Sequence, residues 1–333
     1  MVGRMWGKEG RRHVTEEPSP LGRDCMWGKG TGWHITEKPS PLGRGRHAAG
    51  VFISRSGTGE GLFASMLLAC LFVSSPLAAA SLYDQSVSRL LRERYASSDL
   101  SYIVIDAATR RLIASRWEAI TEPVPVGSLV KPFLALAYAQ KHDFRYPSYF
   151  CHGARDGCWL PRGHGPVDIS SAIAYSCNAY FMNIVSTLKP EDVDSMAQRY
   201  GFSLGQAPSG AAQMIGLGGA WRIDPQELLH SYVLLAAAPR VAGAAELLRG
   251  MALSAKIGTA GAVGLTLHGA AALAKTGTAP CVHQPRAPGD GYVLMLYPAD
   301  QPRLALLVRV HGVPGARAAE LGGRILNSVV NLE

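Results

Sequence analysis

Apolar residues gather in several short runs that are separated by polar turns, and these runs predict one sheet. The segment 101–116, SYIVIDAATRRLIASR, has two apolar runs around a polar turn at 107–110, which is typical of two antiparallel strands. GYVLMLYP and RLALLVRV form a second strand pair about the polar stretch ADQP. A fifth strand, rich in small residues, is expected at the end of LHGAAALAKTGTA. The pattern therefore predicts an antiparallel sheet of about five strands.

Between these strands the apolar spacing is helical. Helices are predicted over 128–140, 167–175, the stretch after SCN up to Leu188, 190–201 and 225–236, and an amphipathic helix over 316–332 closes the chain. Asp224 before Pro225, with Glu227 three positions on, has the arrangement of a capping box. We expect an α+β fold in which the ends of the chain build a sheet flanked by helices, while the middle builds an all-helical lobe.

The first 55 residues differ from the rest. The segment 5–23 recurs at 26–44, an offset of 21, and both copies are rich in Gly, Pro and charge without apolar periodicity. We interpret residues 1–55 as a disordered, repeat-containing segment. An alternative is that the true start of the protein lies further downstream, which mass spectrometry of the native protein would test.

The segment 61–80 has the features of a secretory signal. Its apolar run, from Leu62 to Phe72, is too short to span a bilayer, and the small-residue site Ala78–Ala80 follows it. We expect cleavage near Ala80 and a catalytic domain over 82–333. A buried helix, a lipoprotein site at Cys70 and an uncleaved membrane anchor are the alternatives.

Charge and cysteine content narrow the function classes. The net charge of +8 is spread over the chain and not gathered in one run, which gives no basis for nucleic-acid binding. In an exported protein, Cys151 and Cys158 could close a short disulfide loop, and this pairing stays open. The cysteines and histidines show no metal-ligand spacing, so we expect no metal; His152 and His164 are interpreted as exposed loop residues, and Cys177 as an inward-packing one.

Three short motifs carry the candidate chemistry. They are Ser128-x-x-Lys131, Ser176-x-Asn178 and the run Lys275-Thr276-Gly277-Thr278. The first two begin 48 residues apart, and the third begins 99 residues after the second. In this order they match the motif set of penicillin-recognising acyl-serine enzymes. A second Ser-x-x-Lys, at 186–189, lies after the Ser-x-Asn and does not fit the order.

The resemblance extends beyond the motifs. GSLVKPFLALAY (127–138) resembles the nucleophile helix of penicillin-binding transpeptidases, while 163–181 resembles their approach to the second motif and 215–236 their segment before the third. The similarity thus covers nearly all of residues 100–330. It implies the β-lactamase/transpeptidase-like fold, with an antiparallel sheet and a helical lobe.

The first motif has a direct chemical explanation. A serine hydroxyl is a poor nucleophile near neutral pH and needs a base beside it. Residues three apart on a helix share a face, so Lys131 can reach the Ser128 hydroxyl. Lys131 must be neutral to accept the proton, and burial together with the nearby Lys275 would lower its pKa. By resemblance, the backbone N–H groups of Ser128 and Thr278 would form the oxyanion hole.

The resemblance assigns the remaining roles. Ser176 would pass a proton to the departing amine, and Asn178 would hold the amide carbonyl of the substrate. Lys275, with Thr276 and Thr278, would bind a terminal carboxylate. Gly277 would let an extended peptide lie close to the strand edge.

The implied activity is acyl transfer on D-Ala-D-Ala stem peptides of peptidoglycan, either transpeptidation or carboxypeptidation, through an acyl-Ser128 intermediate without a cofactor. β-Lactams would acylate Ser128 as substrate mimics. The place of action would be the periplasm or the outer face of the bacterial cytoplasmic membrane. Because only about 20 residues separate the signal from the first strand, we expect a bare catalytic domain with a cell-wall partner protein. A β-lactamase and a β-lactam- or muropeptide-sensing domain are the alternatives.

Overall fold

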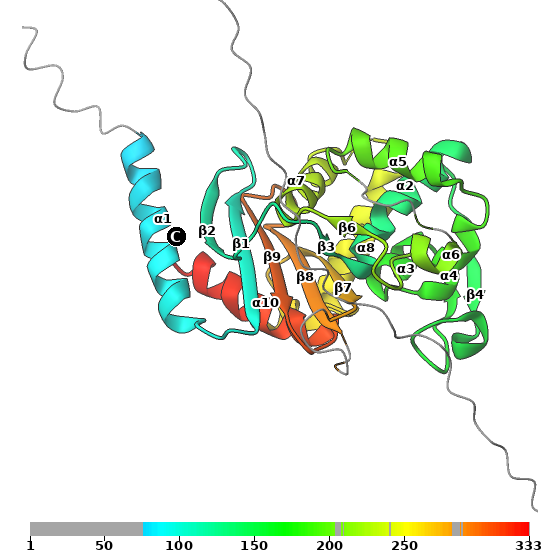
Figure 1. The fold of residues 1–333 in the computed structure, drawn as a ribbon. Helices are drawn as coiled ribbons and strands as arrows, with labels where there is room; N and C mark the ends of the chain where they lie inside the picture. Colours follow the sequence, from blue (N-terminus) through cyan, green and yellow to red (C-terminus); the bar gives the residue numbers. More distant parts are fainter. Residues whose placement is uncertain are drawn as a thin grey trace, which may run out of the picture. The chain divides into compact units, whose positions relative to one another are not determined.

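The computed structural model describes residues 76–332 apart from 204–207, 209, 240, 282–286 and 288, with side chains from residue 82 (Figure 1). The predicted segment 1–55 and residues 61–75 of the predicted signal lie outside this part of the chain. Residues 76–80, which include the expected cleavage site, begin helix α1 (Pro76–Arg94). In the part of the chain that the structure describes, no helix combines the length and apolar character needed to span a bilayer.

A five-stranded antiparallel sheet forms the centre, as predicted. Its strands are β1 (Leu100–Asp106), β2 (Leu112–Arg116), β7 (Leu273–Ala279), β8 (Asp290–Tyr297) and β9 (Leu304–Val310). Their order is β2-β1-β9-β8-β7, so strands from the two ends of the catalytic region pair in the middle. Lys275 lies opposite Leu294, and Leu294 lies opposite Leu307, which fixes the register of the three strands nearest the site.

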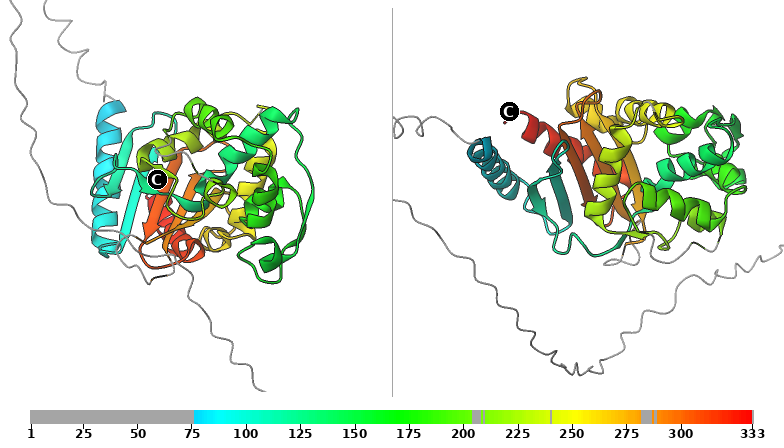
Figure 2. Two further views of the ribbon diagram at one scale, coloured as in Figure 1. Left: turned by 45° about the vertical axis from the view of Figure 1, so that its right-hand side comes forward. Right: turned by 90° about the horizontal axis from the view of Figure 1, so that it is seen from above.

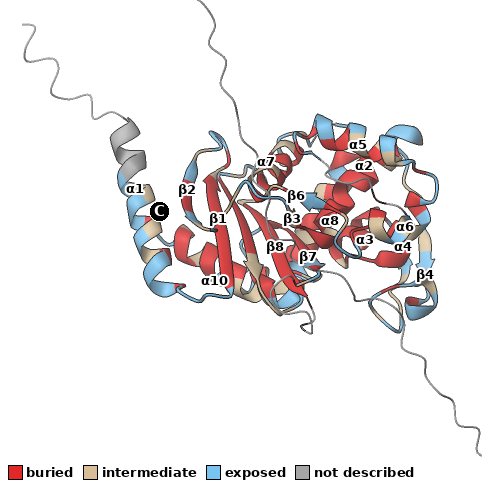
Figure 3. Cartoon of the chain, in the orientation of Figure 1, coloured by how far each residue is buried: buried red, intermediate tan, exposed pale blue. Residues whose placement is uncertain are grey.

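Both faces of the sheet are covered, which explains why its strands are apolar on both sides (Figure 3). One face packs with α7 (Pro225–Ala236), and its core includes Ile103, Leu294 and Leu307. The other face packs with α1 and α10 (Gly315–Val330), and its core includes Val104 and Val293. Neighbouring residues along each strand therefore belong to different cores.

The helical lobe lies beside β7, at the opposite end of the sheet from α1 (Figures 1 and 2). Its elements are the 3-10 helix η2 (Gly127–Val130), α2 (Lys131–Lys141), α3 (Ile169–Ala174), α4 (Asn178–Val185), α5 (Pro190–Arg199) and α6 (Ala211–Met214). The lobe is not all helical, because β4 (Tyr149–Cys151) pairs with β5 (Gly165–Val167) between α2 and α3. Two further short strands, β3 (Val124–Pro125) and β6 (Arg222–Ile223), pair where the chain enters and leaves the lobe.

Several helix boundaries differ from the prediction. The helix expected from Ser128 is divided, since η2 comes first and α2 begins at Lys131, with Pro132 in the first turn where its missing N–H costs nothing. Asp224 caps α7 as predicted, accepting the backbone N–H groups of residues 226 and 227 at 2.7 and 3.1 Å. No capping box closes there, because the Glu227 carboxylate accepts the N–H of Ser203 instead.

Helices α8 (Ala244–Lys256) and α9 (Gly261–Thr266) were not predicted. Helix α8 buries one face at helical spacing, which includes Leu247 and Met251, so the sequence carried a signal that was missed; α9 is too short for such a pattern. They pack together and connect the lobe to the sheet, since α8 contacts both α3 and β7.

Candidate active site

The site begins at η2, which presents Ser128. Gly127 has a positive φ of 57°, and a Cβ on it would lie 2.2 Å from the carbonyl oxygen of Thr278 and 3.1 Å from its nitrogen. Only glycine therefore allows η2 to lie against β7. Ser128 is partly exposed while Gly127, Leu129 and Val130 are buried, so the serine is the residue of this turn that solvent can reach.

The carbonyl of Leu129 is fixed from the sheet side of the lobe. The hydroxyl of Tyr232, a fully buried residue of α7, donates to it at 2.6 Å. On the other side of the turn, a Cβ on Gly216 would lie 2.2 Å from the carbonyl oxygen of Gly127 and 3.1 Å from the nitrogen of Ser128. Sequence reasoning missed both Tyr232 and Gly216; the only signal for them was the glycine-rich stretch IGLGG followed by an apolar helix.

Lys131 follows one turn after the serine and is completely buried. Its backbone N–H donates to the carbonyl of Ser128, and its Nζ points to the second motif. Nζ donates to the carbonyl of Ser176 at 2.9 Å, to the Ser176 hydroxyl at 3.3 Å and to Asn178 Oδ1 at 2.6 Å. The ring of Phe181 lies over the same amine, 5.2 Å from Nζ to the ring centroid.

Ser176 is the meeting point of the three motifs. It adopts a left-handed backbone conformation with φ of 52°, which is uncommon for a non-glycine residue and typical of functional turns. Its hydroxyl accepts from Lys275 Nζ at 3.0 Å as well as from Lys131. Lys275 also donates to the carbonyl of Thr276 at 2.7 Å.

The two lysines have unusual electrostatics. Burial lowers the pKa of Lys131 to about 7, partly offset by the nearby thiols of Cys177 and Cys158, which favour the charged amine. Burial, and then repulsion by Lys131, lowers the pKa of Lys275 well below its ordinary range. Burial thus lowers the pKa of both amines, as predicted for Lys131, and their mutual repulsion adds to the effect at Lys275. Among the described residues, neither amine contacts a carboxylate.

Strand β7 divides the third motif between its two faces. Lys275 and Gly277 face η2, and a Cβ on Gly277 would lie 2.7 Å from the carbonyl oxygen of Val126. The glycine thus permits close packing of β7 on the nucleophile turn, a role different from the predicted one of admitting a peptide. Thr276 donates its hydroxyl to Thr259 at 2.6 Å.

The hydroxyl of Thr278 accepts the N–H of Gly315 at 3.0 Å, where α10 begins. Both threonine hydroxyls therefore contact the elements behind β7 and not Lys275. Their predicted part in binding a carboxylate stays a prediction. The Lys256–Thr259 segment, which resembles the third motif, ends α8 and supplies the partner of Thr276.

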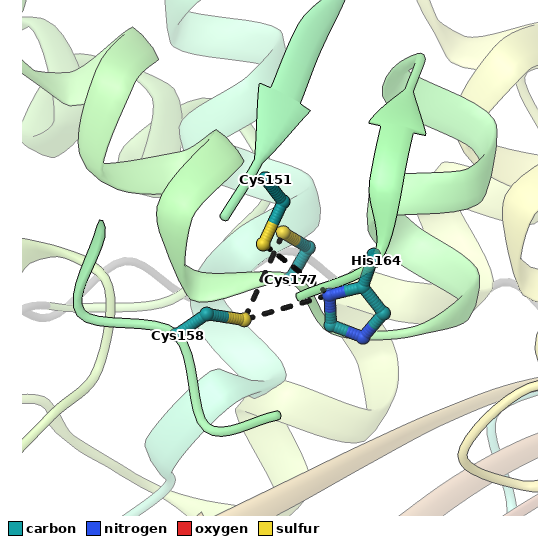
Figure 4. Close-up of side chains that lie close together, drawn as sticks. All are labelled: Cys151, Cys158, His164 and Cys177. Carbon is teal, nitrogen blue, oxygen red and sulfur yellow. Dashed lines mark hydrogen bonds between the residues drawn. The ribbon is translucent and has the colours of Figure 1, made fainter. Parts of the chain in front are cut away.

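A second cluster lies directly behind Ser176. The ligand atoms of Cys151, Cys158, His164 and Cys177 all lie within 4.8 Å of one another (Figure 4). The three cysteines are free, so the Cys151–Cys158 disulfide is not formed. The expectation of an exposed His164 was wrong, since its Nδ1 faces the sulfurs of Cys151 and Cys158 at 3.7 and 3.5 Å. The sequence hid this cluster because its fourth member comes from beyond α3.

Comparison with known proteins agrees with this geometry. The Penicillin binding protein transpeptidase domain family matches residues 93–237. No curated protein sequence matches the chain. Among solved structures, Pseudomonas aeruginosa PBP2 in complex with WCK 5153 has a TM-score of 0.60 and 19% identity over 75% of this chain and 74% of that chain.

Two further solved structures have the same fold. The TP domain of Burkholderia pseudomallei penicillin-binding protein 3 has a TM-score of 0.54 and 18% identity, over 77% of this chain and 93% of that one. PBP2 in its complex with MreC from Helicobacter pylori has a TM-score of 0.62 and 16% identity, over 75% of this chain and 62% of that one. Residues 93–237 of the chain thus match the penicillin binding protein transpeptidase domain family, and the described domain has the fold of these solved transpeptidase domains.

Proposed function

We propose that this protein is an exported serine acyl-transferase that acts on D-Ala-D-Ala stem peptides of peptidoglycan. Ser128 attacks the carbonyl between the two alanines and forms an acyl-enzyme, and D-alanine leaves. An amine of a second stem peptide then takes the acyl group, or water hydrolyses it. β-Lactams acylate the same serine.

The observation that supports this proposal most is the contact of Lys131 and Lys275 with the one hydroxyl of Ser176. Lys131, with a pKa of about 7, is partly neutral near neutral pH and can accept the proton of Ser128. Ser176 touches both amines, so it can relay that proton to the departing amine. Because Lys131 occupies Asn178 Oδ1, the amide nitrogen of Asn178 is the atom that can donate to a substrate carbonyl.

The backbone supports an oxyanion hole at the same place. Gly127 packs against Thr278, which brings the N–H groups of Ser128 and Thr278 to neighbouring positions at the contact of η2 and β7. Two such donors aimed at the developing oxyanion stabilise the tetrahedral intermediate, and losing one typically slows acyl transfer by about 10²–10³-fold. This backbone contact supports the proposed oxyanion hole, as the contacts of Lys131 and Lys275 with Ser176 support the proposed proton relay.

The relatives suggest a partner as well. One solved structure with this fold is a complex of PBP2 with MreC, and another belongs to a peptidoglycan synthase complex, with a TM-score of 0.52 and 15% identity over 77% of this chain and 59% of that one. A cell-wall protein that delivers or positions the peptide substrate is the corresponding partner for this chain.

Fluorescent penicillin labelling tests the acyl chemistry. The wild type should become covalently labelled, and Ser128→Ala should not. Ser186→Ala is the matched control, because Ser186 begins the second Ser-x-x-Lys but is exposed and donates only to the carbonyl of Asn183. Labelling that survives in Ser128→Ala, or a wild type that takes no label, would refute the proposal.

The product distinguishes the reactions within this class. Release of D-alanine from a pentapeptide without cross-linking indicates a carboxypeptidase. Release of D-alanine together with formation of a cross-linked dimer indicates a transpeptidase. Rapid turnover of nitrocefin without lasting label indicates a β-lactamase and contradicts the peptide substrate.

A further inference from the structure

Four side chains from two separate segments converge behind the Ser176 turn (Figure 4). Cys151 ends β4, Cys158 follows the short 3-10 helix Gly153–Asp156, and His164 comes just before β5. Cys177 joins them from the other side of α3, immediately before α4. The catalytic scheme above uses none of these four side chains.

Three of the distances between ligand atoms of the cluster match the edges of a tetrahedral metal site. Cys158 Sγ lies 3.9 Å from Cys177 Sγ, and His164 Nδ1 lies 3.7 Å from Cys151 Sγ and 3.5 Å from Cys158 Sγ. With zinc bonds of about 2.3 Å to sulfur and about 2.0–2.1 Å to nitrogen, the edges of a tetrahedron are about 3.8 Å between sulfurs and about 3.6 Å between sulfur and nitrogen. All three distances agree within roughly 0.2 Å. A disulfide would need about 2.05 Å between sulfurs.

The three cysteines of the cluster are buried. The three cysteines are 1%, 7% and 0% exposed. Cys177 is the N-cap residue of α4, at the positive end of that helix dipole. Buried thiolates are costly without a cation. A bound cation would offset this cost.

The imidazole is fixed in a binding orientation. The ring of His164 stacks on Tyr175, with centroids 5.6 Å apart, and meets the edge of Trp159 at 5.5 Å. Trp159 in turn donates its indole N–H to the carbonyl of Tyr175 at 3.1 Å. These contacts keep Nδ1 directed at the sulfurs.

We propose that Cys151, Cys158, His164 and Cys177 bind one zinc ion in a tetrahedral Cys3His site. Thiolate and imidazole ligands favour zinc over magnesium, calcium or manganese, which prefer oxygen. The protein supplies all four ligands, so the ion has a structural role and no open position for substrate.

The position of Cys177 gives the ion a consequence for the active site. Cys177 lies between Ser176 and Asn178, the two residues that contact Lys131. A zinc bond at Cys177 joins this turn to the β4–β5 hairpin and stabilises the left-handed conformation of Ser176. The zinc ion thus positions the turn that carries Ser176. This positioning role rests on the proposed function, whereas zinc binding does not.

The zinc content of the full-length chain tests the site directly. The wild type should contain one zinc ion that Cys158→Ser and His164→Gln lose. His152→Gln is the matched control, since His152 is an exposed histidine of the same hairpin loop and is bonded to Asp156; this variant should keep the ion. Cobalt exchanged into the wild type should give the thiolate charge-transfer band and the intense visible bands of a tetrahedral thiolate site, which needs no variant to fold.

Zinc absent from the reduced wild type, zinc unchanged in both cluster variants, or copper or iron in place of zinc would overturn the assignment. A Cys151–Cys158 disulfide in the native chain would do the same. Removing the ion with a chelator should slow penicillin labelling of Ser128, and zinc should restore it. If zinc binds as expected but labelling does not depend on it, the positioning role is refuted; if the zinc-loaded chain takes no label at all, the proposed function fails and the zinc site stands.

Discussion

The lowered pKa of Lys131 makes a quantitative prediction about the pH dependence of acylation. The proposed base works only as the neutral amine, so the rate should follow the neutral fraction, rise with pH through about 7 and level off above it. For a pKa of about 7 this fraction rises from about 9% at pH 6 to about 91% at pH 8, a tenfold change. An ordinary lysine, with a pKa of about 10.4, would give a change of about 100-fold over the same range and no plateau.

The measurement is the second-order rate constant of labelling by a fluorescent penicillin from pH 5.5 to pH 9. Lys131→Ala should lower the plateau by about 10²–10⁴-fold, the usual contribution of a general base, and should remove the inflection near pH 7. Lys189→Ala, an exposed lysine of the second Ser-x-x-Lys, should leave the profile unchanged. A wild-type rate that is flat with pH, or that still rises steeply at pH 9, would exclude Lys131 as the base.

Three substitutions test the packing that holds the site. Gly127→Ala should destabilise the protein by about 2 kcal/mol or more in urea unfolding and suppress labelling, because its Cβ would overlap the carbonyl of Thr278 at a positive φ; an unchanged midpoint would contradict this. Tyr232→Phe should lower the free energy of unfolding by about 1–3 kcal/mol and slow labelling, because it leaves the buried carbonyl of Leu129 without its hydrogen-bond donor. Asp224→Ala should lower the free energy of unfolding by about 1 kcal/mol, or Tm by a few degrees, and should leave penicillin labelling intact. A loss of labelling would show that this helix cap affects the site.

The parts of the fold that could be predicted are those fixed by local chemistry. Short apolar runs bounded by turns located the five strands of the central sheet, and Asp224 and Pro225 located the start of α7, because turns and caps are properties of a few neighbouring residues. The division of the nucleophile helix was missed. It depends on the positive φ of Gly127 and on the approach of β7, neither of which a local pattern contains.

The order of three motifs predicted which residues meet, and the structure shows how they meet. Lys131 reaches Ser176 and Asn178, and Lys275 reaches Ser176, as a shared cleft requires. The left-handed backbone of Ser176 could not be anticipated, because serine seldom adopts it and tertiary contacts impose it. The Cys/His cluster was missed for a related reason, since its four ligands fit no short spacing pattern and come together only when α3 folds back.

The strand period also limits what a motif can mean. Lys-Thr-Gly-Thr reads as one recognition unit, but a strand directs successive side chains to opposite faces. Lys275 and Gly277 consequently face η2, while the hydroxyls of Thr276 and Thr278 bond to Thr259 and to the N–H of Gly315 behind the strand. In this arrangement the third motif contributes the amine of Lys275 to the site, and Gly277 allows the strand to pack against η2. Its two threonines hold β7 to α8 and α10, so the precision of the site comes from the packing behind the strand as much as from the residues in front of it.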